Sequence, residues 1–149
     1  MNEGELLKSF MKFKGIHRRM CLNEFRKLEI SKGQPKILNY LAENNGSIQK
    51  DIAQNCNIEP ATVTSILATM ERVGFVERRP NADDRRILNV YLTEKGKITQ
   101  LKLQKAIYNI EKKCFKNFSE EEKKLIKSFF ERMYNNLNEG DEATNGKTT

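Results

Sequence analysis

The sequence contains no tryptophan and only one histidine among its 149 residues. It has no run of about 18 apolar residues, which excludes a membrane-spanning helix. Residues 1–13 carry scattered charges and no continuous apolar segment, so we expect no secretory signal. The three cysteines are odd in number and widely spaced, which excludes a disulfide framework and a zinc pattern. These absences favour a cytoplasmic protein with no membrane partner.

The motifs of common enzymes are also absent. The sequence has no Walker loop, no G-x-S-x-G turn and no dinucleotide-binding glycine pattern. We therefore expect neither an enzyme nor a bound cofactor. A single histidine is too few for a zinc-sensing site. No helix combines a Lys/Arg-rich face with a separate aromatic face, which disfavours binding to a membrane surface.

The charge is unevenly distributed along the chain. With 27 Lys and Arg against 20 Asp and Glu, the net charge is +7. The last eleven residues, 139–149, carry a net charge of −2 and no large apolar side chain, and we predict a disordered tail there. Residues 1–138 are then a single domain of charge +9. That charge permits an anionic partner such as nucleic acid, without proving one.

Helical periodicity dominates the first third of the chain. Residues 5–28 carry two neighbouring apolar stripes, so this helix has more than one surface to bury. A polar chain of this size often buries such a surface against a partner subunit. Gly33 and Pro35 start a second helix, which ends at the turn 44–46. Ser47 is a good N-cap for a third helix over residues 48–55.

The spacing of the apolar residues changes from helical to alternating in the segment from residue 60 to residue 92. Pro60 suits the first turn of a helix over residues 60–73, and Gly74 suits its end. Alternation then predicts strands at 75–79 and 87–92, joined by a polar loop over residues 80–86. Thr93 can cap a helix that runs to about residue 118. Ser119 and Glu122 form a capping box for a last helix.

This order predicts a mainly α fold with a small β-hairpin, arranged as a winged helix-turn-helix. A helix that enters the major groove needs a small polar face, which this chain offers at Thr62, Thr64, Ser65 and Thr69. A wing that enters the minor groove needs cations, which Arg85 and Arg86 supply. Each feature alone is typical of solvated surface. Their succession within about 45 residues favours binding to double-stranded DNA.

Residues 84–96 run D-R-R-I-L-N-V-Y-L-T-E-K-G, and they resemble the signature of the MarR family (multiple antibiotic resistance regulator). The segments around Pro60–Thr64 and Met70–Val76 are similar to that family as well. The resemblance implies a homodimeric transcription regulator, often a repressor of a pseudo-palindromic operator that a small aromatic or phenolic effector relieves. It implies a DNA-binding part at 34–92 between dimerisation helices at 5–30 and 94–138.

Carried onto this chain, the resemblance implies roles for individual residues. Asp84 would pair with Arg86 and hold the wing in shape. Arg86, alone or together with Arg85, would enter the minor groove. Thr62, Thr64 and Ser65 would face the major groove. Phosphates would be held at the start of the third helix by Ser47, Gln49 and Lys50. Many relatives carry arginine on the recognition helix where this chain has Ser65 or Thr69.

Two features leave alternatives open. His17 lies between Phe13 and Met20 on an apolar stripe, where it is either a packed histidine or a polar group in an effector pocket. Cys21 is either a structural thiol or a redox sensor whose pKa Arg18 and Arg19 lower. A winged-helix protein-interaction module without DNA binding is a further alternative.

Overall fold

The computed structural model describes residues 1–2 and 4–145. These residues form two compact units, Met1–Ile110 and a second one from Glu111 onward. The first unit holds the helices α1 (Glu5–Lys27), α2 (Gln34–Glu43), α3 (Gln49–Cys56) and α4 (Pro60–Arg72), the strands β1 (Ser47–Ile48), β2 (Val76–Pro80) and β3 (Leu88–Leu92), and most of α5 (Glu94–Cys114). The second unit holds the last turn of α5 and the long helix α6 (Glu120–Asn145).

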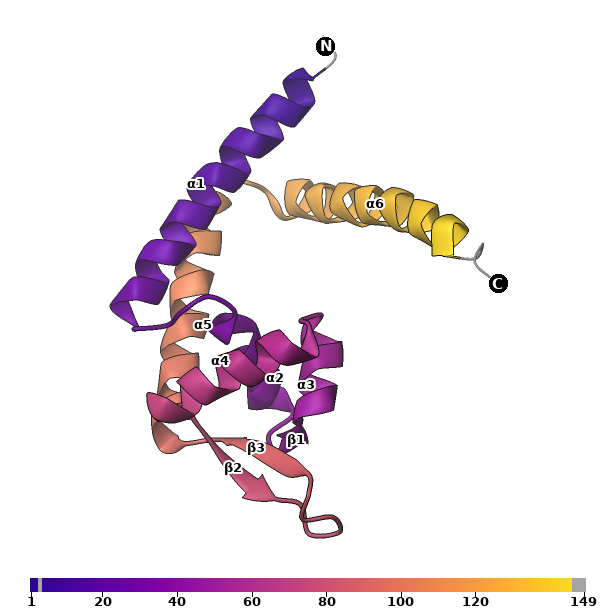
Figure 1. Ribbon diagram of the computed structural model, residues 1–149. Helices are drawn as coiled ribbons and strands as arrows, with labels where there is room; N and C mark the ends of the chain where they lie inside the picture. Colours follow the sequence, from indigo (N-terminus) through magenta and orange to yellow (C-terminus); the bar gives the residue numbers. More distant parts are fainter. Residues whose placement is uncertain (3, 146–149) are drawn as a thin grey trace. The chain divides into compact units, whose positions relative to one another are not determined.

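The three strands form one antiparallel sheet in the order β1-β3-β2. The hairpin pairs Val76 with Leu92 and Pro80 with Leu88, so its loop begins directly after Pro80. Figure 1 shows this hairpin extending beyond the helices α2, α3 and α4. The mainly helical fold with a winged hairpin is therefore confirmed, and the third strand, β1, is an addition to it.

The core of the first unit lies between α2, α3, α4 and the sheet. Its fully buried members come from every one of these helices and from β2 and β3, and α5 adds Leu103. The side chains below 2% exposure include Ile37, Leu38, Leu41, Ile52, Val63, Leu67, Met70, Phe75 and Val90. This core holds α3 and α4 against the sheet, which sets where the exposed face of α4 and the hairpin loop lie.

Both ends of α4 follow from its sequence. Pro60 occupies the first turn, where a missing N–H costs nothing. At the other end Gly74 has φ +82°, and the amides of Gly74 and Phe75 donate to the carbonyls of Glu71 and Met70. This is a Schellman motif, which turns the chain sharply into β2.

The capping predictions for the later helices are also confirmed. The Gly96 amide donates to Oγ1 of Thr93 at 3.0 Å, so Thr93 caps α5. Ser119 and Glu122 exchange backbone-to-side-chain hydrogen bonds of 2.7 and 3.1 Å, which is a complete capping box at the start of α6.

Ser47 does not cap α3, and that prediction is wrong. Gly46 has φ +85° and turns the chain so that Ser47 pairs with Val90 in the sheet. The Ser47 hydroxyl donates backward to the Asn44 carbonyl at 2.7 Å. Ile48 occupies the cap position, without a side-chain cap. Pairing with β3 thus outweighs a local capping preference.

Two predicted helix ends also differ from the structure. Helix α5 ends at Cys114 rather than near 118, because Asn117 adopts φ +67° and the chain turns, with Phe115 and Phe118 in edge-to-face contact. Helix α6 continues to Asn145, so the predicted tail boundary at 138 is wrong: residues 139–145 are helical. An established helix extends at little cost per residue. The rest of the predicted tail, 146–149, lies outside the described residues.

Candidate nucleic-acid interface

Helix α4 presents a small polar surface opposite its buried face. Val63, Leu67 and Met70 are fully buried. Three of the four predicted recognition side chains, Thr62, Thr64 and Ser65, are exposed, whereas Thr69 is half-buried. A major groove about 12 Å wide admits an α-helix, and small polar side chains on its outer face can then reach the base edges.

The sequence reading missed three residues of this face. Ala61, Ala68 and Arg72 are exposed and recur at helical spacing with Ser65. The signal was available, because these positions lie opposite the buried stripe of α4. The middle of the exposed face is therefore built from methyl and hydroxymethyl groups, with one guanidinium in the last turn.

Two threonine hydroxyls on α4 are already engaged within the protein. Thr64 Oγ1 donates to the Pro60 carbonyl at 3.0 Å and accepts a hydrogen bond from Nε2 of Gln49. Thr69 Oγ1 donates to the Ser65 carbonyl at 3.3 Å. Each hydroxyl has one hydrogen, so neither can donate to a base in this arrangement.

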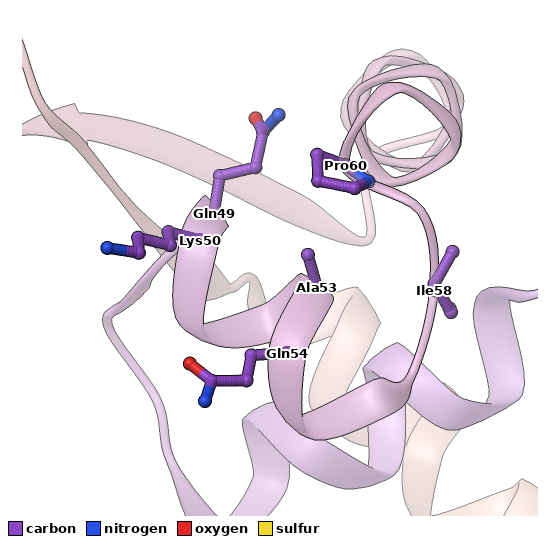
Figure 2. A pocket seen from close by; sticks show the side chains of 6 residues that line it. All are labelled: Gln49, Lys50, Ala53, Gln54, Ile58 and Pro60. Atoms are coloured by element: carbon purple, nitrogen blue, oxygen red, sulfur yellow. The ribbon is translucent and has the colours of Figure 1, made fainter. Parts of the chain in front are cut away.

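The start of α3 lies beside the start of α4. A hollow of about 420 Å³ separates them, lined by Gln49, Lys50, Ala53, Gln54, Ile58 and Pro60. Figure 2 shows Gln49 and Pro60 at its rim and Lys50 pointing away from Pro60. Lys50 is exposed and Gln49 half-buried, whereas the half-buried Ser47 hydroxyl is committed to Asn44. Of the three residues predicted to contact phosphate, Gln49 and Lys50 keep N–H groups available at this helix start, whereas the hydroxyl hydrogen of Ser47 is already used.

The wing is held by its own side chains. Asp84 accepts 3.0 Å hydrogen bonds from the backbone amide of Arg86 and from its guanidinium Nε and Nη2. These bonds lower the pKa of the Asp84 carboxyl and raise the pKa of Arg86. The Arg86 side chain is nonetheless 91% exposed. The predicted Asp84–Arg86 pair is present, and it holds a cation at the surface of the wing, with Arg85 exposed next to it.

Asparagines tie this wing to the rest of the sheet. Asn81 Oδ1 accepts from the amides of Asp83 and Asp84, and its Nδ2 donates to Oδ1 of Asn89 at 2.9 Å. Asn89 Nδ2 in turn donates to the Gly46 carbonyl at 2.6 Å. A continuous chain of hydrogen bonds thus runs from the wing to the turn before β1. Sequence reasoning did not single out either asparagine.

The comparisons with known proteins agree with this geometry. Residues 30–88 match the model of the MarR family, a span that runs from the residues before α2 to the first residue of β3. The transcriptional repressor YetL of Bacillus subtilis (strain 168) is 31% identical over 110 residues, which are 70% of this chain and 66% of YetL. The structure of the transcriptional regulator SlyA, 26% identical, superposes with a TM-score of 0.74 over 94% of this chain and 99% of that one. The chain belongs to the MarR family.

A DNA complex is among the structures similar to this MarR protein. A point mutant of S. aureus MepR, bound to an oligodeoxyribonucleotide, is 25% identical, with a TM-score of 0.65 over 89% of this chain and 97% of that chain. This MarR protein is a DNA-binding transcriptional regulator and not an enzyme.

Helix α1 of this MarR protein buries none of its side chains within the described residues. Phe13 and His17 are exposed with ring centroids 5.8 Å apart, and Met20 is half-buried. Only the end of α1 packs on the core, through Phe25 and the adjoining Leu28. In the single chain the imidazole of His17 lies outside the core and contacts Phe13 and Cys21, its neighbours on α1.

The Cys21 thiol is half-buried on α1, with its Sγ 3.9 Å from the imidazole nitrogens of His17. Burial raises the pKa of the Cys21 thiol, which is opposite to what a reactive thiolate needs. Burial also raises the pKa of Cys56, which lies in the core, although Lys36 partly opposes that shift.

Helix α6 also exposes a stripe of large apolar side chains. Met133 is 45% exposed and Leu137 is 78% exposed, and the exposed fractions of Leu125, Phe129, Phe130 and Tyr134 lie between these values.

Among the described residues, no three His, Cys, Asp or Glu side chains gather as a metal site would require. The described helices likewise include none long and apolar enough to cross a membrane.

Proposed function

We propose that this MarR protein is a homodimeric repressor that acts in the cytoplasm on a pseudo-palindromic operator. The observation that carries the proposal is the wing, where Asp84 holds the 91% exposed Arg86 at the surface. A guanidinium in that position suits the narrow, electronegative minor groove. Arg85 lies beside it and contributes to the same field.

In this proposal α4 contacts the bases and α3 contacts the phosphate backbone of the DNA. Thr62, Thr64, Ser65 and Thr69 of α4 face the major groove. Gln49 and Lys50, at the start of α3, contact phosphates, where free helix N–H groups favour anions. The wing and the two helix starts come from one core, which fixes their relative positions on the DNA.

The dimer rests on apolar surface that the single chain leaves in water. Helix α1 exposes Leu6, Leu7, Phe10 and Met11 to between 44% and 67%, and α6 exposes a comparable stripe. Apolar surface of this extent is typical of a subunit interface rather than of a monomer. We propose that both helices contribute to the contact with a second copy.

Relief of repression would follow from a change in spacing. Two recognition helices in a dimer must lie about 34–36 Å apart to contact successive major grooves on one face of DNA. A small aromatic or phenolic effector that binds a dimer of different spacing shifts the population away from DNA. Phe13, His17 and Met20 would line such a site, with the imidazole as its polar group.

The experiment is a binding titration of the full chain against DNA from upstream of its own gene, at several salt concentrations. We expect affinity to fall steeply with salt, and Arg86→Ala to weaken binding by about 1–3 kcal/mol while the dimer stays intact by light scattering. Lys32→Ala, which removes an exposed cation between α1 and α2, is the control. Equal affinity of the Arg86→Ala and parent proteins would overturn the role of the wing, and a monomer at micromolar concentration would overturn the dimer.

A further inference from the structure

The first eleven residues of α4 lack the side chains that most often specify bases. From Pro60 to Met70 it contains no Arg, Lys, Asn, Gln, Asp or Glu. Bidentate contacts to guanine or adenine need one of the first four of these, and contacts to the cytosine amino group use one of the last two. Before the last turn, which carries Glu71 and Arg72, the outer surface of α4 consists of the methyl groups of alanine and threonine and a few hydroxyls.

The hydrogen bonds around Thr64 further reduce the number of groups on α4 that can donate a hydrogen bond to a base. Its single hydroxyl hydrogen goes to the Pro60 carbonyl at 3.0 Å, and Gln49 Nε2 occupies one of its lone pairs. The hydroxyl therefore has no hydrogen left for the N7, O6 or O4 acceptors of a base. The methyl group of Thr64 is the part of the side chain that no hydrogen bond engages.

Three neighbours have the same character. Thr69 donates its hydroxyl hydrogen to the Ser65 carbonyl at 3.3 Å. Ala61 and Ala68 are exposed and offer only a methyl group. In the major groove, the chemical partner of an exposed methyl group is the C5-methyl of thymine.

We propose, given that the chain binds an operator as described above, that α4 recognises its half-site mainly through thymine methyl groups. In this proposal the Gln49–Thr64–Pro60 hydrogen bonds make Thr64 a specificity-determining residue that contacts thymine through its methyl group. Gln49 acts as a positioning residue, because it holds the hydroxyl of Thr64 away from the base. The operator half-sites are accordingly rich in A·T pairs where α4 lies.

The first test replaces thymine by deoxyuridine, one position at a time, within the half-site that a footprint assigns to α4. This change removes the C5-methyl and keeps base pairing. A lost methyl contact should weaken binding about fourfold in each half-site, measured by fluorescence anisotropy at fixed salt. Binding that is unchanged at every such position overturns this proposal and leaves the DNA-binding function standing. Failure to bind any duplex overturns both.

The second test separates methyl from hydroxyl at Thr64. Thr64→Val keeps a methyl in place and removes the hydroxyl, so discrimination between thymine and uracil should persist. Thr64→Ser keeps the hydroxyl and removes the methyl, so discrimination at one position should disappear. The opposite pattern would show that the hydroxyl contacts the base and would overturn the assignment. Ser31→Ala, at an exposed position between α1 and α2, is the matched control, and circular dichroism confirms that each variant folds.

Gln49→Ala completes the set. Without Nε2 of Gln49, the Thr64 hydroxyl loses one of its two partners, and the discrimination against uracil at the Thr64 position should fall. A loss of affinity that is equal for thymine and uracil operators would assign Gln49 to a phosphate contact alone and overturn its positioning role. Arg72→Ala tests the competing mode of recognition, in which Arg72 contacts guanine. A loss of DNA affinity confined to operators with guanine at the contacted position would indicate that mode. It would overturn recognition mainly through methyl groups.

Discussion

Asn89 donates a 2.6 Å hydrogen bond from its side-chain amide to the backbone carbonyl of Gly46, forty-three positions earlier in the chain. The same side chain accepts from Asn81, which in turn accepts from the amides of the wing. One side chain therefore couples the turn before β1 to the loop that carries Arg85 and Arg86. The order of the wing depends on the sheet as well as on its own turn.

The first prediction concerns this coupling. Asn89→Ala should lower the free energy of unfolding by about 1–2 kcal/mol, because the Gly46 carbonyl and the Asn81 amide lose their partner. Amide hydrogen exchange at Asp83 and Asp84 should accelerate, and DNA affinity should fall. Asn109→Ala, at an exposed position on α5, is the matched control. Unchanged exchange in the wing would show that Asn81 orders the loop without Asn89.

The second prediction concerns pH. The hydrogen bonds from Arg86 lower the pKa of Asp84 in the folded protein, so the pair contributes stability above the ordinary aspartate pKa of about 3.9. That contribution is lost as the pH falls through the lowered pKa. An NMR titration of the Asp84 carboxyl should give a pKa below the ordinary value, and Arg86→Ala should return it toward that value.

The neighbouring carboxylate supplies the control for this titration. Asp83→Asn should leave the titration of Asp84 unchanged, because the bonds to Arg86 are made by Asp84 alone among the described contacts of this loop. A shift of Asp84 that survived Arg86→Ala would assign the lowered pKa to the backbone of the wing instead.

The third prediction concerns the junction between α4, the sheet and α5. A Cβ at Gly96 would lie 2.0 Å from the carbonyl oxygen of Phe75, so Gly96→Ala must displace backbone. We expect a loss of roughly 1–3 kcal/mol in unfolding free energy, measured by denaturant titration. Gly15→Ala is the control, since nothing lies within 4 Å of a Cβ there and alanine favours the helix. A neutral Gly96→Ala would mean that α5 can shift away from Phe75 at little cost.

The fourth prediction concerns Cys21. Because burial raises the pKa of its thiol, little thiolate forms at neutral pH and alkylation by iodoacetamide should be slow. Peroxide should therefore not release the protein from DNA, and Cys21→Ser should behave like the parent. Release of the parent by peroxide, but not of Cys21→Ser, would instead support the redox-sensing alternative.

Local signals determined much of this protein. Pro60 at the start of α4, Gly74 at its end, the Thr93 cap and the Ser119–Glu122 capping box are each visible over a few residues, and each is present in the structure. The Asp84–Arg86 pair spans two positions and is present as well. Such features depend on backbone geometry over one turn, so the sequence alone suffices to predict them.

The tertiary structure decided what depends on residues far apart in the chain. Pairing with Val90 places Ser47 in a strand rather than at a helix cap. Gln49 donates a hydrogen bond to the hydroxyl of Thr64, fifteen positions later in the chain. Burial against the core makes Thr69 half-buried and leaves Ala61, Ala68 and Arg72 exposed on the outer face of α4. The hydrogen-bond partner of a hydroxyl and the pairing partner of a strand are the groups that the fold brings near. These groups are near one another only after the core has formed.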